Sequence, residues 1–122
     1  MNVWIVAPHK DHAKLLEPLQ EAPYRVFCND TVKAAIEALP GALGSVDAFV
    51  LAGLDGPMAS LSVTAIRSNP KIGKAPVLVV GEALTAAEVA ALRKAGADLC
   101  YRLPFSPAVF AARVRAALAL KG

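Results

Sequence analysis

Residues able to bind metal or transfer protons lie close together near the start of the chain, at His9, Asp11 and His12. Imidazole and carboxylate groups are metal ligands, and an imidazole also exchanges protons near neutral pH. Their spacing, however, matches no defined metal or acid–base motif, and polar residues commonly open a helix. We therefore expect an ordinary helix start, with metal binding or acid–base chemistry as the alternative. Neither a metal nor another cofactor is expected.

The two cysteines, Cys28 and Cys100, each lie in an apolar segment with no Cys or His at the spacing of zinc ligands. This pattern supports neither a disulfide framework nor a zinc site. A thiol senses oxidants only where it is accessible and ionised. We expect both residues to be reduced thiols that pack as small apolar groups, with redox sensing as the alternative.

Two further kinds of catalytic pattern lack support. Residues 41–45, Gly-Ala-Leu-Gly-Ser, lack the lysine and the spacing of a nucleotide-binding P-loop. The sequence also offers no combination of nucleophile, base and orienting group. We therefore expect that the chain is not an enzyme.

The 122 residues, 56% of them hydrophobic and 19% charged, suit one compact domain spanning residues 1–122. No apolar run approaches the roughly 20 residues that span a bilayer, and no basic stretch precedes the first apolar run as in an export signal. We expect a cytoplasmic protein without a membrane contact. Its ends, Met1 and Gly122, favour a natural single-domain protein without a DNA-binding output domain.

Short, unbroken apolar segments predict five strands that are covered on both faces. They are residues 3–7, 25–28, 47–52, 76–80 and 99–103. The fourth of them is rich in β-branched residues and is expected to be central.

Helical spacing and capping signals predict a helix after each strand. The first helix is expected over residues 11–21, where Pro18 shortens or kinks it, and the second runs from a cap among residues 29–31 to Pro40-Gly41. The third is expected over residues 60–68, and the fourth runs from the capping box Thr85–Glu88 to Gly96. The fifth runs from Ser106-Pro107 to about residue 120. Residues 53–57 are expected to form a loop. Within residues 60–68, the side chains of Leu61, Ala65 and Ile66 are expected to face the core.

Five alternations of strand and helix predict parallel strands joined by right-handed crossovers. The expected fold is α/β, a flavodoxin-like (βα)5 three-layer sandwich with a five-stranded parallel sheet of order 2-1-3-4-5. Ligands bind such sheets at the carboxyl ends of the strands. The positions of interest therefore follow Ala7, Ala52 and Val80 and lie around Leu103.

The segment Gly96–Phe105 resembles the Gly-Ala…Lys-Pro-Phe segment of response-regulator receiver domains. Residues 47–58 and 76–80 add two strand ends of the same kind. Over nearly its whole length the chain therefore resembles a CheY-like receiver domain, the phosphoacceptor module of two-component signal transduction and phosphorelay.

The resemblance also implies that the phosphorylation machinery is missing. The family's magnesium-binding acidic residues match Ala7 and Pro8, its phosphoacceptor aspartate matches Ala52, its hydroxyl residue Gly81 and its lysine Leu103. A methyl group can neither attack phosphorus nor bind metal. The aromatic switch matches Cys100, and the neighbouring Tyr101 should point to the opposite face of the sheet. We expect a degenerate pseudo-receiver that acts independently of phosphorylation.

Asp55 lies three residues beyond Ala52 and is a candidate displaced acceptor or metal ligand. In an Asp-Gly-Pro turn, however, an aspartate usually accepts hydrogen bonds from nearby backbone amides. We expect this role in turn geometry.

Basic residues are concentrated in the last third of the chain. From residue 83 onward six basic residues accompany two acidic ones, whereas the first 82 residues carry seven basic and eight acidic ones. The resemblance places this third in the fourth helix, fifth strand and fifth helix, the family's usual docking and dimerisation surface. The candidate partner-binding residues are Arg93, Lys94, Arg102, Arg113 and Arg115.

Positive potential on this surface favours an acidic signalling protein, with a homodimer through the same surface or an anionic small ligand as further possibilities. The alternative is that these basic residues form a solvated surface without a partner. Nucleic acid is not expected, because the basic residues lack interleaved aromatics and a reading helix.

A different class of function remains open. The vacated pocket, bounded by Ala7, Pro8, Ala52, Gly81 and Leu103, is a candidate site for a small ligand other than phosphate. The alternative to an interaction module is therefore a small-ligand-sensing domain.

Overall fold

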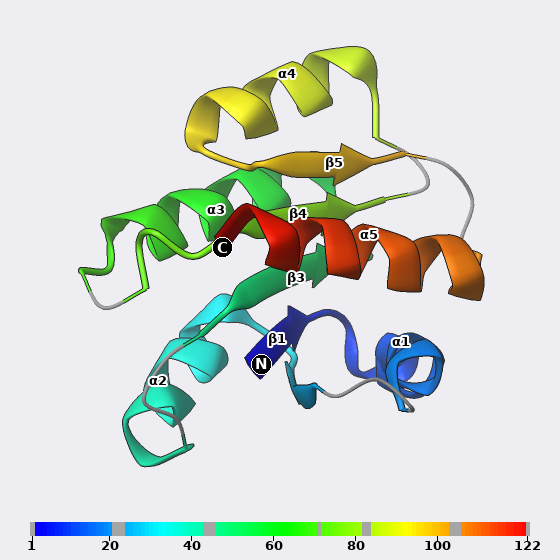
Figure 1. Ribbon diagram of the computed structural model, residues 1–122. Helices are drawn as coiled ribbons and strands as arrows, with labels where there is room; N and C mark the ends of the chain where they lie inside the picture. The colour runs from blue at the N-terminus through cyan, green and yellow to red at the C-terminus, as the bar shows by residue number, and fades with distance from the viewer. Residues whose placement is uncertain are drawn as a thin grey trace.

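The computed structural model describes residues 2–20, 24–42, 46–70, 72–81, 84–102 and 106–121. It contains five strands, which alternate with helices along the chain (Figure 1). The strands are β1 (Asn2–Val6), β2 (Arg25–Asn29), β3 (Ala48–Ala52), β4 (Val77–Val80) and β5 (Leu99–Tyr101). The helices are η1 (His9–Asp11), α1 (His12–Leu16), η2 (Glu17–Leu19), α2 (Val32–Ala42), α3 (Gly56–Ser68), α4 (Ala86–Ala95) and α5 (Pro107–Lys121).

The strands form one parallel sheet of order β2-β1-β3-β4-β5, which confirms the predicted flavodoxin-like topology. Val3 of β1 aligns with Val26 of β2 on one side and with Ala48 of β3 on the other. The middle strand is β3, whereas β4 lies between β3 and the edge strand β5. The prediction that residues 76–80 lie inside the sheet is therefore confirmed, although β4 is not its middle strand.

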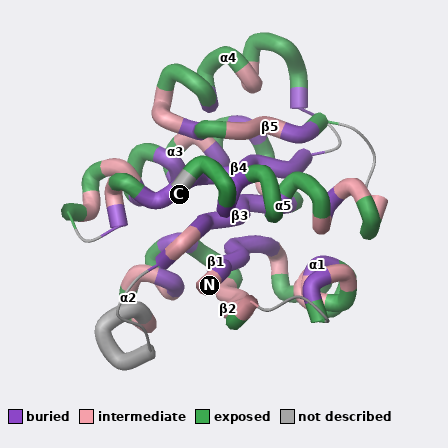
Figure 2. Tube along the Cα trace, in the orientation of Figure 1, coloured by how far each residue is buried: buried purple, intermediate pink, exposed green. Residues whose placement is uncertain are grey.

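Alternate side chains of each strand point to opposite faces of the sheet, and each face is covered by helices (Figure 2). On one face, Val3 and Ile5 share a core with Leu15 of α1 and Phe110 and Val114 of α5. The opposite core contains Trp4 and Val6 together with buried residues of α2, α3 and α4, among them Ala35, Val63, Ile66 and Leu92. The three predicted layers are therefore present.

Several local signals act as the sequence predicts. The segment around Pro18 breaks into α1 and the 3-10 helix η2, because proline has no N–H to continue the helix. Helix α4 opens with the complete capping box of Thr85 and Glu88 and ends at Gly96, whose φ of 120° is left-handed. Helix α5 starts at Pro107, and the carbonyl of Ser106 accepts a bond from Phe110 N–H.

Two predicted helix bounds are wrong. Helix α2 continues to Ala42, beyond the predicted end at Pro40. Proline has no N–H and so removes one helical hydrogen bond. Pro40 lies so close to the end of α2 that few helical hydrogen bonds follow it. Helix α3 begins at Gly56 instead of Ser60, because the Asp55 side chain caps it and Pro57 occupies its first turn, where the missing N–H has no helical partner.

The buried face of α3 is a third difference. Its buried residues are Gly56, Ala59, Ser62, Val63 and Ile66, at the three- and four-residue spacing of one helix face. Ile66 is therefore buried as predicted, but the predictions for Leu61 and Ala65 are wrong, since both are exposed.

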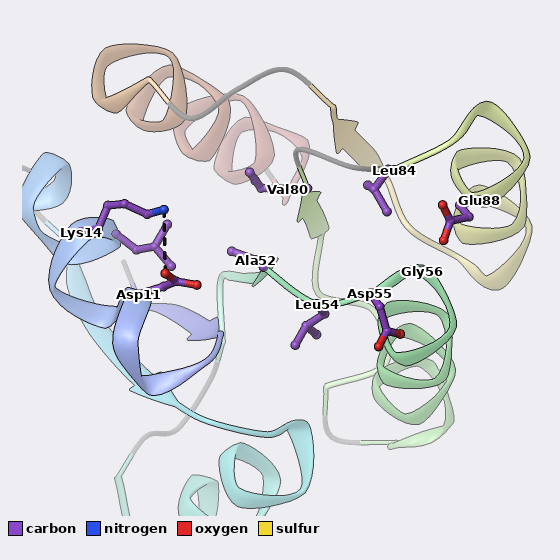
Figure 3. Close-up of a pocket in the computed structure, with 12 residues that line it drawn as sticks. Asp11, Lys14, Ala52, Leu54, Asp55, Gly56, Val80, Leu84 and Glu88 are labelled. Atoms are coloured by element: carbon purple, nitrogen blue, oxygen red, sulfur yellow. Dashed lines mark ion pairs between the residues drawn. The ribbon is translucent and has the colours of Figure 1, made fainter.

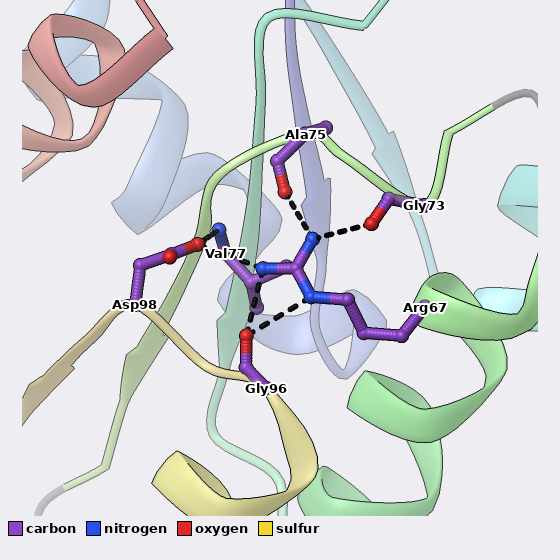
Figure 4. Close-up of polar contacts among 6 residues, drawn as sticks. All are labelled: Arg67, Gly73, Ala75, Val77, Gly96 and Asp98. Carbon is purple, nitrogen blue, oxygen red and sulfur yellow. Dashed lines mark hydrogen bonds and ion pairs between the residues drawn. The ribbon is translucent and has the colours of Figure 1, made fainter.

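Arg67, near the end of α3, links the loop before β4 to the turn between α4 and β5 (Figure 4). Its Nε and Nη2 groups donate to the Gly96 carbonyl at 3.0 and 2.7 Å, and Nη1 donates to the carbonyls of Gly73 and Ala75 at 3.0 and 2.6 Å. Nη2 also pairs with Asp98 Oδ2 at 2.8 Å, and this carboxylate accepts from Val77 N–H as well. The guanidinium thus fixes the start of β4 against the turn between α4 and β5.

Among the described residues, none of the helices combines the length and apolar character needed to cross a bilayer.

Candidate functional site

A cavity of about 450 Å³ opens at the carboxyl ends of β3 and β4 (Figure 3). Ala52, Val80 and Gly81 form its floor. Asp11, Lys14 and Leu15 line one side, and Leu54, Asp55, Gly56, Leu84 and Glu88 line the other. The cavity therefore lies at the strand ends where the topology predicts a ligand site.

The floor offers no reactive side chain. Ala52 ends β3 opposite Val80, and the next residue, Gly53, donates its N–H to the Val80 carbonyl at 3.2 Å. Gly81 likewise donates to the Tyr101 carbonyl at 2.9 Å. Because Ala52 carries only a methyl group and Gly81 has no side chain, this floor supplies neither a nucleophile nor a metal ligand.

Of the five residues predicted to bound the pocket, the structure places some at the cavity and others away from it. Ala52 and Gly81 line the cavity. Ala7 is fully buried in the core beneath α1 and α5. Pro8 lies beside the cavity, since a Cβ added to Gly53 would lie 3.2 Å from Pro8 Cδ. Leu103 lies outside the described residues.

Asp11 brings to the cavity a carboxylate whose position there is not predicted from the sequence. A Cβ added to Gly53 would lie only 2.9 Å from Asp11 Oδ2, so this carboxylate rests on the backbone next to Ala52. Gly53 has a φ of +70°, which also favours glycine. Lys14 Nζ lies 3.8 Å from Asp11 Oδ1, as the helical spacing of the two residues allows.

The two carboxylates on the other side, Asp55 and Glu88, serve helix starts. Asp55 Oδ1 accepts from Met58 N–H at 2.8 Å, which confirms the predicted role in bonding nearby amides. Glu88 Oε1 accepts from Thr85 N–H at 2.9 Å. Glu88 also packs so closely on Gly56 that any Cβ there would overlap its Oε2. Both acidic groups are therefore engaged in local structure.

His9 and His12 lie outside the lining of this cavity and approach Asp30, in the segment that follows β2. In the sequence these histidines lie beside Asp11. The structure separates them, because the Asp11 carboxylate lies against Gly53 whereas the imidazoles lie near Asp30. Sequence spacing alone could not reveal Asp30 as their neighbour.

The two cysteines are half-buried and form no disulfide. Burial raises the pKa of the Cys28 thiol to about 11, and burial also raises the pKa of Cys100 against an opposing effect of the nearby Arg93 guanidinium. Both groups are therefore neutral thiols near pH 7. Cys100 packs with the α3–α4 core, whereas Tyr101 lies in the core beneath α5, as strand alternation predicts.

Basic side chains flank the edge strand β5 from both of its neighbouring helices. Arg93 of α4 lies near Cys100, and the Arg113 guanidinium of α5 lies 5.6 Å from the centre of the Tyr101 ring. Among the side chains that the structure describes, the exposed basic residues of this region are Arg93, Lys94, Arg102, Arg113 and Arg115. We call these five residues the basic face. They lie on α4, directly after β5, and on α5.

No protein-family model matches the chain, and no curated protein matches it. Solved structures, in contrast, do match the chain. A presumed response regulator from Chloroflexus aurantiacus shares 25% identity and a TM-score of 0.77, with 97% of each chain covered. A response regulator from Thermotoga maritima shares 17% identity and a TM-score of 0.81, again with 97% of each chain covered.

A third match is the receiver domain of a sensor histidine kinase from Pseudomonas aeruginosa, with a magnesium ion coordinated in its active-site cleft. It shares 15% identity and a TM-score of 0.74, with 97% of each chain covered. Structural likeness to receiver domains thus extends over nearly the entire chain.

Proposed function

We propose that this chain, which has the fold of response-regulator receiver domains, is a single-domain, phosphorylation-independent signalling module that binds an acidic protein partner through its basic face. The fold supports a module of two-component signalling, and receiver domains are generally non-enzymatic modules that interact with signalling partners such as kinases. The observation that carries phosphorylation independence is Ala52 at the cavity floor.

Phosphoryl transfer to a receiver pocket needs a nucleophile and a divalent cation held by oxygen ligands. Ala52 supplies no nucleophile, and Ala7 is buried away from the cavity. The cavity's remaining carboxylates either bond to helix amides, as Asp55 and Glu88 do, or pair with Lys14, as Asp11 does. These contacts support a pocket that has lost the phosphoryl switch.

The charges of the last third support a protein-binding surface. Its two carboxylates, on Glu88 and Asp98, are engaged with the α4 N-terminus and with Arg67. Neither of these contacts involves the basic face. The five cations of that face therefore set the local potential, which steers an acidic partner and disfavours a basic one. Because the face includes both sides of the β5 edge, it can also meet a second copy of the chain.

The test is charge reversal at Arg93→Glu, Arg102→Glu and Arg113→Glu in one variant. The matched control reverses three exposed lysines elsewhere, Lys10, Lys33 and Lys74. Immobilised wild-type protein captures the partner, and we expect the first variant to bind at most about one tenth of that amount. The reason is that each lost charge contact across the interface costs on the order of 1 kcal/mol.

The control variant should retain the partner as the wild type does, with bound proteins quantified by mass spectrometry. Equal retention by wild type and by the Arg93, Arg102 and Arg113 variant would contradict the assignment of the basic face. Sedimentation velocity of the same variants shows whether the charge reversal abolishes a homodimer or abolishes binding of a different protein.

The cavity supports a second candidate, a small-ligand sensor. Leu15, Leu54, Val80 and Leu84 give it apolar walls, and three carboxylates against the single Lys14 disfavour an anion. A neutral or cationic small molecule that raises the melting temperature equally in wild type and in the charge-reversed variant would favour this function over partner binding.

A further inference from the structure

Three potential metal ligands meet outside the cavity, at the carboxyl ends of β1 and β2. We propose that His9, His12 and Asp30 bind a divalent transition-metal ion of the zinc type. One ligand atom from each residue lies within 4.8 Å of the other two. This inference goes beyond the proposed signalling role and does not depend on it.

Sheet topology brings the three residues together. Strands β1 and β2 are parallel neighbours, with Val6 aligned to Asn29, and the Ala7 N–H donates to the Asn29 carbonyl at 3.1 Å. The segments that follow the two strands therefore emerge at the same edge of the sheet. One of them carries His9 and His12, and the other carries Asp30.

The distances between the ligand atoms suit one small ion. His12 Nε2 lies 3.4 Å from Asp30 Oδ1, and His9 Nδ1 lies 3.8 Å from the same oxygen. Two ligand atoms that are each ~2.1 Å from a tetrahedral zinc ion lie about 3.4 Å apart. The His12–Asp30 distance already matches this value, and the His9–Asp30 distance exceeds it by a few tenths of an ångström.

The side chains differ in freedom in a way that suits ion capture. The His12 side chain is only 14% exposed, and its Nε2 donates to the Ala7 carbonyl at 2.8 Å, a bond that must break when the same nitrogen binds an ion. The side chains of His9 and Asp30 are 86% and 61% exposed, so they can rotate to close around an ion. Burial thus limits the movement of the His12 ring, whereas the other two ligands are adjustable.

The donor set also selects the ion. Two imidazole nitrogens and one carboxylate oxygen favour zinc and neighbouring transition metals over magnesium and calcium, which prefer oxygen ligands alone. Binding through His12 Nε2 displaces its proton, and the Ala7 carbonyl oxygen beside it then offers a further oxygen to the ion or to its water. Three protein ligands leave at least one position for solvent.

The same contacts also fit two protonated histidines paired with Asp30, so metal binding itself is the discriminating measurement. Tag-free protein is titrated with Zn²⁺ by calorimetry and with Co²⁺ by visible absorption. We expect one equivalent of either ion to bind, with Co²⁺ giving the absorption of a low-symmetry site. Alanine at His9, His12 or Asp30 should weaken binding by more than the ~10–100-fold typical of losing an outer-shell partner.

Two matched controls identify the ligands. Asp11→Asn removes the neighbouring carboxylate that faces the cavity, and Cys28→Ser removes the thiol of the adjacent strand; both should leave the affinity unchanged. If His12→Ala fails to fold, the exposed His9 and Asp30 still test the site. Absence of binding by the wild type, or binding that survives in the His9 and Asp30 variants, would overturn the proposal.

Discussion

At the scale of single residues, burial decides the chemistry of the cysteines. Burial raises the Cys28 pKa from 9.0 to about 11. A group with a higher pKa in the folded state binds more protons folded than unfolded between these two values. Its stabilising contribution is therefore complete below about pH 9 and is lost as the pH rises toward 11.

This linkage predicts that the urea midpoint of the wild type falls more steeply between pH 9 and 11 than that of Cys28→Ala. Tyrosines and lysines titrate in the same range, so the difference between the two proteins isolates Cys28. Iodoacetamide should also alkylate Cys28 slowly at pH 8. Rapid alkylation at that pH, or identical pH profiles for both proteins, would show that Cys28 ionises normally and would reopen redox sensing.

At the scale of single residues, some positions of the candidate site can be predicted from the sequence and others cannot. Ala52 and Gly81 line the cavity because strand ends in a parallel sheet are fixed by topology, which the apolar pattern reveals. The position of Asp11 against Gly53 and the approach of Asp30 to the histidines depend on loop paths and side-chain rotamers. Neither has a signature in residue spacing.

At the scale of elements, capping residues explain most of the agreement between sequence and structure. Thr85, Glu88 and Gly96 delimit α4 as predicted. The sequence predicts that Asp55 is a turn residue, and the bond that it accepts from Met58 N–H makes that turn the first turn of α3. The buried face of α3 includes Gly56, Ala59, Val63 and Ile66, and Leu61 lies off this face although its apolar side chain predicts a core position.

Arg67 is the main tie between elements, and its five donated hydrogen bonds account for every N–H of the guanidinium. A lysine ammonium has three donors and no planar fork, so it cannot serve the same carbonyls and Asp98 together. We expect Arg67→Lys to lower the free energy of unfolding by about 1–3 kcal/mol, measured by urea denaturation.

Lys74→Ala, at an exposed position in the loop between α3 and β4, is the control and should leave the free energy of unfolding within about 0.5 kcal/mol of wild type. A stable Arg67→Lys variant would show that water replaces the guanidinium at these carbonyls. The role of Arg67 is not readable from the sequence, since four of its bonds end on backbone oxygens, which every residue has.

At the scale of the whole molecule, the scaffold and the reactive groups differ in how well they match receiver domains. The sheet order and nearly the entire chain agree with solved receiver structures. The floor of the cavity carries alanine and glycine, and the surface around β5 carries the charge. This contrast is the basis of our proposal that the function lies in the surface and not in the cavity.

The most direct test of that assignment is a set of amide NMR spectra of the wild type with Mg²⁺, before and after addition of beryllofluoride, which mimics a phosphoryl group. We predict no saturable shifts at Ala52, Gly53, Val80 or Gly81, and no added phosphoryl mass after incubation with acetyl phosphate. Saturable shifts centred on Asp11 or Asp55 would contradict the account and would show that a relocated carboxylate still carries the phosphoryl signal.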